Sequence, residues 1–157
     1  MVIEKNYLIK TLKESGIKSQ VYTNMKKLKQ GNEPHVGAVL RNGETFTRSV
    51  SKKVYTDQEG RRKRRVKLWN RSTSLHVVIA DTSEEKVEEI LENFLVNLKK
   101  GLDVNGNWTD IEVGDADWVE DGDSILKAKV AVQFDVTFEG GIYQDRKIQP
   151  MEIGSIE

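Results

Sequence analysis

Apolar and polar residues alternate between Ile125 and Phe138. Every even position of this run is apolar, whereas the odd positions from Lys127 to Thr137 are polar apart from Ala131. Successive side chains of a β-strand point to opposite faces, so the run must bury one face and turn the other to solvent or a partner. At about 3.3 Å per residue the strand would extend for roughly 40 Å, more than twice a common strand. We expect it to be the spine of a sheet and to be long enough to reach a neighbouring subunit.

The composition favours a soluble protein that matures in a reducing compartment. The 157 residues are most simply one domain. Cysteine is absent, which excludes disulfides, thiolate metal sites and cysteine nucleophiles. No apolar run approaches the roughly 18 residues of a membrane span, and the opening MVIEKNYLIK has the pattern of neither a signal peptide nor an anchor. We therefore expect no membrane partner and assembly in the cytoplasm.

The remaining pattern predicts an α+β fold with a mixed, mainly antiparallel sheet and two main helices on one side. Helical spacing predicts one helix over residues 4–14. A second helix is expected to follow a capping box of Thr82 and Glu85 and to end at Lys99 and Lys100. Further strands are expected in residues 17–22, from Pro34 onward, in 75–80 and in 108–113, with a loop over 26–33.

A long hairpin is predicted over residues 44–71. Its tip is the sequence DQEGR, in which Gly60 can take the left-handed conformation that closes a short turn. The arms are heavily charged, and a two-stranded ribbon with so little apolar surface is marginal alone. We expect the hairpin to project and to be stabilised by something outside the domain.

The end of the sequence is predicted to be an extended arm. The pair Gly140-Gly141 breaks the strand pattern, and Pro150 follows in a stretch without helical or strand period. The expected organisation is a single domain over residues 1–139 and a C-terminal arm over 140–157. The arm offers three apolar contacts: Ile142, Tyr143 and Ile148.

Positive and negative charges are equal in number but segregated along the sequence. There are 25 Lys and Arg residues and 25 Asp and Glu residues. Residues 44–71 contain ten basic and three acidic residues, a net charge of +7, whereas 103–123 contain eight acidic residues and no basic one, a net charge of −8. The acidic segment is expected to be a plausible strand followed by a turn-rich stretch.

The basic run RRKRRVK over residues 61–67 has three possible interpretations. It is a solvated or subunit-contacting ribbon, a contact to DNA or RNA, or a site for other anions. Few aromatic residues interleave with it for base stacking, and an equally charged acidic segment lies in the same chain. The candidate interface residues are Arg48, Lys52, Arg61, Arg62, Arg64, Arg65 and Lys67 in the hairpin, and Asp110, Glu112, Asp115, Asp117, Glu120 and Asp121 in the acidic segment.

Candidates for chemistry are few, so we expect no enzyme, no cofactor and no metal. His76 lies in an apolar strand, where a hydrogen-bonded structural histidine is the usual case, and His35 is expected to be solvated in a loop. No nucleophile elbow, P-loop, zinc-protease motif or dinucleotide fingerprint occurs. The acidic segment fails the EF-hand pattern, because Trp108 replaces the sixth-position glycine and Gly114 the terminal glutamate.

The order of elements resembles one known family. An N-terminal helix beginning YLIKTLKESGIKSQVY is followed by a proline-led strand and a long charged hairpin. The strand LHVVIADTSEE then runs into EKVEEILENFLVNLKKG, and after GNW a final long strand is closed by FEGGIY. Over nearly the whole chain this is similar to the tail-terminator (tail-completion) proteins of long-tailed phages and prophages.

The resemblance implies a structural protein of a virion tail. It implies a ring, usually of six subunits, that sits on the last disc of the tail tube, stops polymerisation and offers a surface to a head-completion or neck protein. The implied location is the head–tail junction of the virion, with the host cytoplasm during assembly. The family has no residue motif sharp enough to assign roles position by position.

Three hypotheses follow for the charged segments. In the first, subunits associate head to tail, the basic hairpin of one facing the acidic segment of the next, with Trp118 or Tyr143 supplying apolar contact. In the second, the hairpin is a nucleic-acid-binding module of a monomer, and even a terminator could touch DNA transiently. A small hydrolase is the third, and it would depend on His76 or on a pair such as Asp115 and Asp117.

Overall fold

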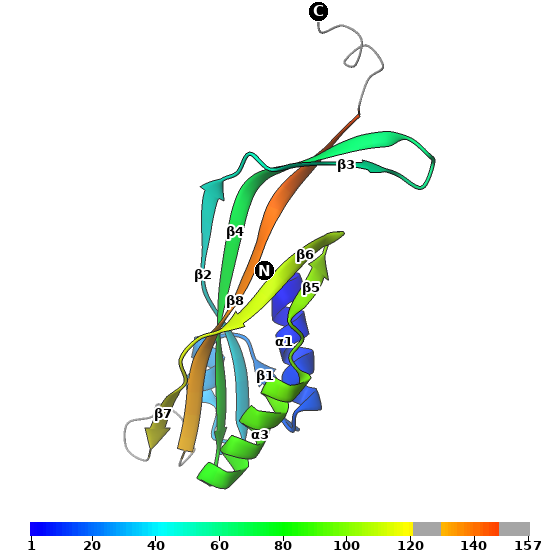
Figure 1. The fold of residues 1–157 in the computed structure, drawn as a ribbon. Coiled ribbons are helices and arrows are strands. Elements are labelled where there is room, and N and C mark those ends of the chain that lie inside the picture. The colour runs from blue at the N-terminus through cyan, green and yellow to red at the C-terminus, as the bar shows by residue number, and fades with distance from the viewer. Residues whose placement is uncertain (121–129, 148–157) are drawn as a thin grey trace, which may run out of the picture.

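The two longest strands form the centre of the sheet. The computed structural model describes residues 1–120 and 130–147, and within them β8 spans Val130–Lys147 and β4 spans Arg62–Asp81. These strands pair antiparallel along their whole length, from Asp81 opposite Val130 to Lys63 opposite Lys147. The alternation predicted for the spine is confirmed from residue 130 onward (Figure 1). Its first part, residues 125–129, lies outside the described residues.

Eight strands build one mixed, mostly antiparallel, curled sheet in a single α+β domain. The order is β1-β2-β4-β8-β6-β5, with β3 beside β4 and β7 beside β8; only β1 and β2 run parallel among these pairs of the described chain. The other elements are α1 (Val2–Glu14), β1 (Val21–Tyr22), α2 (Met25–Gln30), β2 (Val36–Arg48), β3 (Lys52–Thr56), α3 (Glu84–Asn97), β5 (Gly101–Val104), β6 (Asn107–Val113) and β7 (Asp117–Glu120). The predicted fold class is confirmed.

The main core lies between the sheet and the two long helices, α1 and α3. Both helices cover the same face, as predicted (Figure 1). The apolar side of β8 and inward residues of β4 meet Leu8 and Leu12 of α1 and Phe94 of α3. The ring of Phe94 packs against Phe134 at 5.5 Å between centroids. Burial of each such side chain contributes about 1.5–3 kcal/mol, so this layer dominates the stability of the domain.

A short third helix, α2, covers part of the opposite face. The loop predicted over residues 26–33 is therefore wrong. The Asn24 side chain caps the helix by accepting hydrogen bonds from the backbone N–H groups of Lys26 and Lys27. Leu28 is the only buried residue of the helix, and it packs in a second, smaller core cluster. A six-residue helix with one apolar anchor shows no periodicity, which is why the pattern did not reveal it.

Helix α3 begins one residue later than predicted and ends at Asn97. Its N-cap is Ser83, whose hydroxyl accepts a hydrogen bond from the Lys86 N–H at 3.4 Å. Thr82 is not the cap: its hydroxyl oxygen accepts from the Lys86 side-chain ammonium at 3.4 Å, and its backbone N–H donates to the Asp81 carboxylate at 2.7 Å. The predicted capping box is therefore wrong by one position, and Lys99 and Lys100 lie beyond the helix.

The predicted hairpin is confirmed, but it is not two-stranded. Strands β2 and β3 both pair with β4, and the turn between β3 and β4 has Gly60 at φ 81°. The outer half of β8 adds a third strand along β4 as far as Lys147. We call the part that projects from the body the distal ribbon: β3, residues 62–67 of β4 and residues 143–147 of β8 (Figure 1). The hairpin was expected to be stabilised by something outside the domain, but a strand of the chain itself, β8, pairs along it.

The two glycines at 140 and 141 do not end the spine strand. A Cβ atom on Gly140 would lie 2.7 Å from the Thr109 hydroxyl, and one on Gly141 would lie 2.8 Å from the Trp69 carbonyl, where β4 bulges. Glycine in a strand often marks such close approaches rather than a break. The extended arm is therefore wrong for residues 140–147, which are strand; residues 148–157, with Ile148, lie outside the described residues.

The acidic segment contains more strand than expected. The predicted strand over 108–113 is confirmed as β6, which pairs with β5 and with β8. The stretch predicted to be turns also includes β7, which pairs with β8 near its start. Asp121 lies outside the described residues. No helix in the described part of the chain has the length and apolarity needed to cross a membrane.

Candidate interaction surfaces

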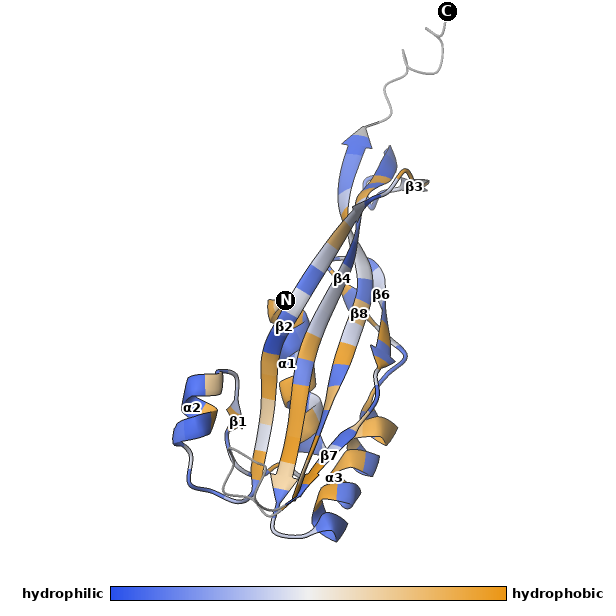
Figure 2. Ribbon diagram, turned by 90° about the vertical axis from the view of Figure 1, so that its left-hand side faces the viewer, coloured by the Kyte–Doolittle hydropathy of each residue, from blue (hydrophilic) through white to orange (hydrophobic). Residues whose placement is uncertain are grey.

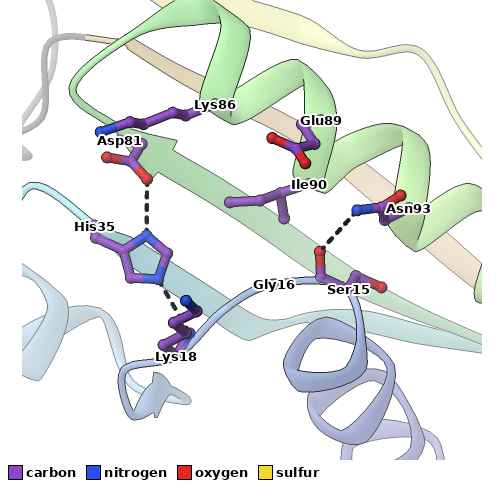
Figure 3. Close-up of a pocket in the computed structure, with 9 residues that line it drawn as sticks. All are labelled: Ser15, Gly16, Lys18, His35, Asp81, Lys86, Glu89, Ile90 and Asn93. Carbon is purple, nitrogen blue, oxygen red and sulfur yellow. Dashed lines mark hydrogen bonds and ion pairs between the residues drawn. The ribbon is translucent and has the colours of Figure 1, made fainter.

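The pocket that most resembles a chemical site lies between α1, β2, β4 and α3. It is open, has a volume of about 430 Å³ and is lined by His35, Asp81, Lys86 and Glu89 among others (Figure 3). His35 points to Asp81, with 2.8 Å between Nδ1 and the carboxylate Oδ2. The other ring nitrogen, Nε2, accepts a hydrogen bond from the Lys18 backbone N–H at 3.0 Å. The expectation of a solvated His35 is therefore wrong.

These contacts fix the histidine tautomer and give the pair a structural role. Because Nε2 accepts from a backbone N–H, the proton lies on Nδ1 and is donated to Asp81. Burial raises the pKa of the Asp81 carboxyl, but hydrogen bonds from His35 and the Thr82 N–H outweigh it, so the pKa falls below its ordinary value. Ser15, on the same wall, donates its hydroxyl hydrogen to the Thr11 carbonyl at 2.6 Å. The polar atoms of His35, Asp81 and Ser15 are thus engaged in hydrogen bonds within the fold.

Replacing the histidine should therefore cost stability. His35→Ala is expected to lower the free energy of unfolding by about 1–2 kcal/mol, since the Asp81 side chain, 10% exposed, loses one of its hydrogen-bond donors. The matched control is His76→Ala, whose partner Asp135 is 47% exposed and stays hydrated, so the loss should stay below about 1 kcal/mol. Urea denaturation followed by circular dichroism measures both; equal losses would contradict the structural role of His35.

His76 is hydrogen-bonded, as its sequence context predicted. Its ring nitrogens lie 2.7 Å from Asp135 Oδ1 and 2.9 Å from Gln133 Oε1, both on the neighbouring strand β8. This arrangement lies on the face opposite α1 and α3, beyond the smaller core cluster. In the described part of the chain, no group of three His, Asp or Glu side chains is placed to hold a metal ion.

The charged side chains of the distal ribbon fall into two sets. The first set pairs within the chain: Arg65 with Asp145 at 2.9 Å, Lys63 with Asp57 at 3.2 Å, and Arg61 with Glu59 at 3.5 Å. Arg65 also donates to Gly106 O and Asn107 Oδ1 and so ties the ribbon to the turn between β5 and β6. Its hydrogen bond to Asp145 lowers the pKa of that carboxyl. Arg65, a candidate interface residue, is thus engaged in its own chain.

The second set lies on the opposite face of the ribbon. Side chains alternate along a strand, so Arg62, Arg64 and Arg146 face away from the side that carries Arg65. Arg64 and Arg146 are direct cross-strand partners, an arrangement of like charges that destabilises a sheet. The carboxylate of the ribbon, Asp145, and the two of its tip turn, Asp57 and Glu59, are paired with the first set. The arginines of the second set have no ion-pair partner in the described residues. We call Arg62, Arg64 and Arg146 the arginine platform.

Two further candidate residues of the hairpin stack on aromatic rings. The Arg48 guanidinium lies 4.2 Å from the centroid of the Trp69 ring, and Lys67 Nζ lies 5.9 Å from that of Tyr143. These contacts order the basic side chains without neutralising them. The side chain of Lys52, another candidate, lies outside what the structure describes. Figure 2 shows that the projecting end of the sheet is largely hydrophilic, whereas apolar residues gather on the strands of the body.

The acidic candidates lie away from the ribbon: Asp110 and Glu112 are on β6, opposite Glu139 and Thr137 in the middle of β8, and Asp117 and Glu120 are on β7, near the start of β8. Glu112, Asp115, Asp117 and Glu120 are exposed, and none forms an ion pair in the described chain. Among them Trp118 is 40% exposed. Asp110 is different, because it accepts a hydrogen bond from the Trp108 indole at 2.9 Å. We call the four free carboxylates and Trp118 the acidic edge; Figure 1 places β7 and the ribbon at opposite ends of the molecule.

The sequence revealed both charged segments, but it did not show which basic residues are paired within the chain and which are not. The run RRKRRVK does not show which of Arg64 and Arg65 has an ion-pair partner, because that depends on the register with β8. Strand alternation was the available signal: it separates residues 62 and 64 from 63 and 65. The His35–Asp81 pair joins positions 46 residues apart, and no local pattern announces it.

Comparison with known proteins finds similarity to solved structures. No family model matches the sequence, and no curated protein does. A solved structure does: the PVC sheath/tube terminator of an extracellular contractile injection system, seen by cryo-electron microscopy in its extended state. The TM-score is 0.50 at 12% sequence identity, and the match covers 96% of this chain. The likeness is one of fold. This chain spans about 60% of the length of that terminator.

Proposed function

We propose that this protein is a structural terminator of a phage or phage-like tail. It would form a ring on the end of the tail tube, stop tube polymerisation and provide the interface for a head-completion or neck protein. The single observation that carries the proposal is the fold shared with a sheath/tube terminator across 96% of the chain. The order of elements in the sequence points to the same family.

The shape and chemistry of the chain support an assembly role. The ribbon projects and carries arginines without ion-pair partners in the described chain, and the acidic edge lies apart from it. A monomer would gain little stability from such surfaces, whereas an assembly can use them as interfaces. The His35–Asp81 pair, the nearest thing to a catalytic dyad, is engaged in structural hydrogen bonds. The partners proposed are further copies of this chain, the tube protein and a head or neck protein, in the virion after assembly in the host cytoplasm.

Electron microscopy of tail tubes tests the proposal. The protein, carrying a gold label, is mixed with tubes of the same tail and imaged in negative stain. The expected result is one ring-shaped cap, and label at one end of each tube only. Label spread along the tube wall, or tubes without any label, would contradict the proposal.

Nucleic-acid binding is the second candidate, and the arginine platform is the observation that favours it. Cross-strand arginines can neutralise phosphates, and such binding falls steeply as salt rises. The equal numbers of acidic and basic residues argue against it, because binders of this type usually carry a net positive charge. Filter binding of random duplex DNA to a protein that stays monomeric would favour this candidate over the ring.

A further inference from the structure

We infer that the arginine platform of one copy binds the acidic edge of the next copy. The inference rests on the proposed ring and names the contact that closes it. A contact between two different surfaces of the same chain is heterologous, and it generates a closed ring when its rotation permits. The platform lies at the outer end of β4 and β8, whereas Glu112 is opposite the middle of β8 and β7 pairs near its start, so the two surfaces lie apart within one molecule (Figure 1).

Several features of the platform indicate that its arginines need a binding partner. Arg64 and Arg146 face each other across β4 and β8 with no carboxylate between them in the described chain. The Nε atom of Arg64 is enclosed and has no hydrogen-bond partner there, which is unusual for a buried polar atom. Among the residues that the structure describes, Arg146 donates only to the neutral Gln144 side chain. Carboxylates from outside would relieve the repulsion and supply acceptors.

Charge complementarity within the chain indicates that the partner bound by the arginine platform is a second copy. The acidic edge offers exposed carboxylates without partners, and residues 103–123 contain no basic residue that could compete for them. The platform carries three arginines and the acidic edge four carboxylates, so each copy brings opposite charges of similar size to a repeating contact. A polyanion such as DNA would satisfy the platform but would leave the acidic edge unexplained. A second copy accounts for both surfaces.

Apolar contact must supply much of the affinity, since exposed ion pairs contribute little individually. Trp118, 40% exposed, lies within the acidic edge, and Val54, 49% exposed, is the cross-strand neighbour of Arg64. Tryptophan and arginine are the residues most often found at the energetic centre of interfaces. The charges then set the register and the rate of encounter, and the contact should weaken as salt rises.

A charge-swap experiment tests the contact. The ribbon variant carries Arg62→Glu, Arg64→Glu and Arg146→Glu; the edge variant carries Glu112→Lys, Asp115→Lys, Asp117→Lys and Glu120→Lys. Like-charge contacts cost several kcal/mol, so each variant alone should self-associate at least about 100-fold more weakly than the natural chain in sedimentation velocity. Mixing the two should restore assembly, because every contact in an alternating ring is again between opposite charges. A misfolded variant could not be rescued in this way.

The matched control reverses three exposed lysines away from both surfaces, Lys13, Lys26 and Lys29, and should assemble like the natural chain. Assembly by either swap variant alone, no rescue on mixing, or loss in the control would overturn the inference. So would a natural chain that stays monomeric both free and on tube ends. Caps that form equally with both swap variants would leave the terminator proposal intact and remove only this contact. Salt-sensitive assembly without tube capping would support this contact and contradict the terminator proposal.

Discussion

Phe94→Ala is expected to lower the free energy of unfolding by about 3–5 kcal/mol, a large part of the roughly 5–15 kcal/mol that stabilises a typical domain. The Phe94 side chain is fully buried, and its ring packs against Phe134 of β8 at 5.5 Å between centroids. The substitution leaves a cavity between α3 and the centre of the sheet, and α3 is held there by few other buried residues: Val87 and Ile90. Denaturation followed by circular dichroism measures the loss.

The matched control for this prediction is Phe46→Ala. The Phe46 side chain is 46% exposed on β2, and the Arg71 guanidinium lies 5.9 Å from its ring centroid. An exposed contact of this type contributes about 0.5–1 kcal/mol, so the loss should be several-fold smaller than at Phe94. Similar losses for the two variants would mean that the helix layer is not the main core.

Gly101→Ala should cost about 3 kcal/mol, the upper end of the range for overpacking. Gly101 begins β5, and a Cβ atom there would meet the indole ring of Trp108 and lie 2.7 Å from the Thr109 carbonyl oxygen. The indole could turn away, but the carbonyl belongs to the paired strand β6 and cannot move without disturbing the ladder. The readouts are the denaturation midpoint and the tryptophan emission.

Gly43→Ala provides the corresponding control on another strand. Gly43 lies at the irregularity in β2, and no atom lies within 4 Å of the position that a Cβ would occupy. Its variant should stay within about 0.5 kcal/mol of the natural protein. If both glycine variants lost equal stability, backbone conformation would be the cause and the close approach of β6 would not.

The large elements were predictable because their signals are local. Alternation located the centre of β8, helical spacing found α1 and α3, and the turn sequence around Gly60 located the tip of the hairpin. These patterns report which residues of one element face the core, and they hold whatever the element packs against. The mixed sheet with both helices on one side followed from them.

The predictions that failed concern features that depend on contacts between segments far apart in the sequence. Gly140 and Gly141 looked like a break because their close neighbours, Thr109 and Trp69, lie 31 and 72 positions away in the sequence. The third strand of the ribbon depends on that same continuation of β8. The division of the basic residues likewise needed the register between β4 and β8, which places Arg65 opposite Asp145 and Arg64 opposite Arg146.

The most direct test of the proposed function is to measure the elongation of tail tubes in the presence of increasing amounts of this protein. A terminator acts at tube ends, so elongation should stop at about one ring of copies per tube, far below the concentration of free tube subunits. Tubes already capped should not lengthen when more tube protein is added. Elongation that continues unchanged, or that slows only when this protein matches the free subunits in number, would contradict the proposed function.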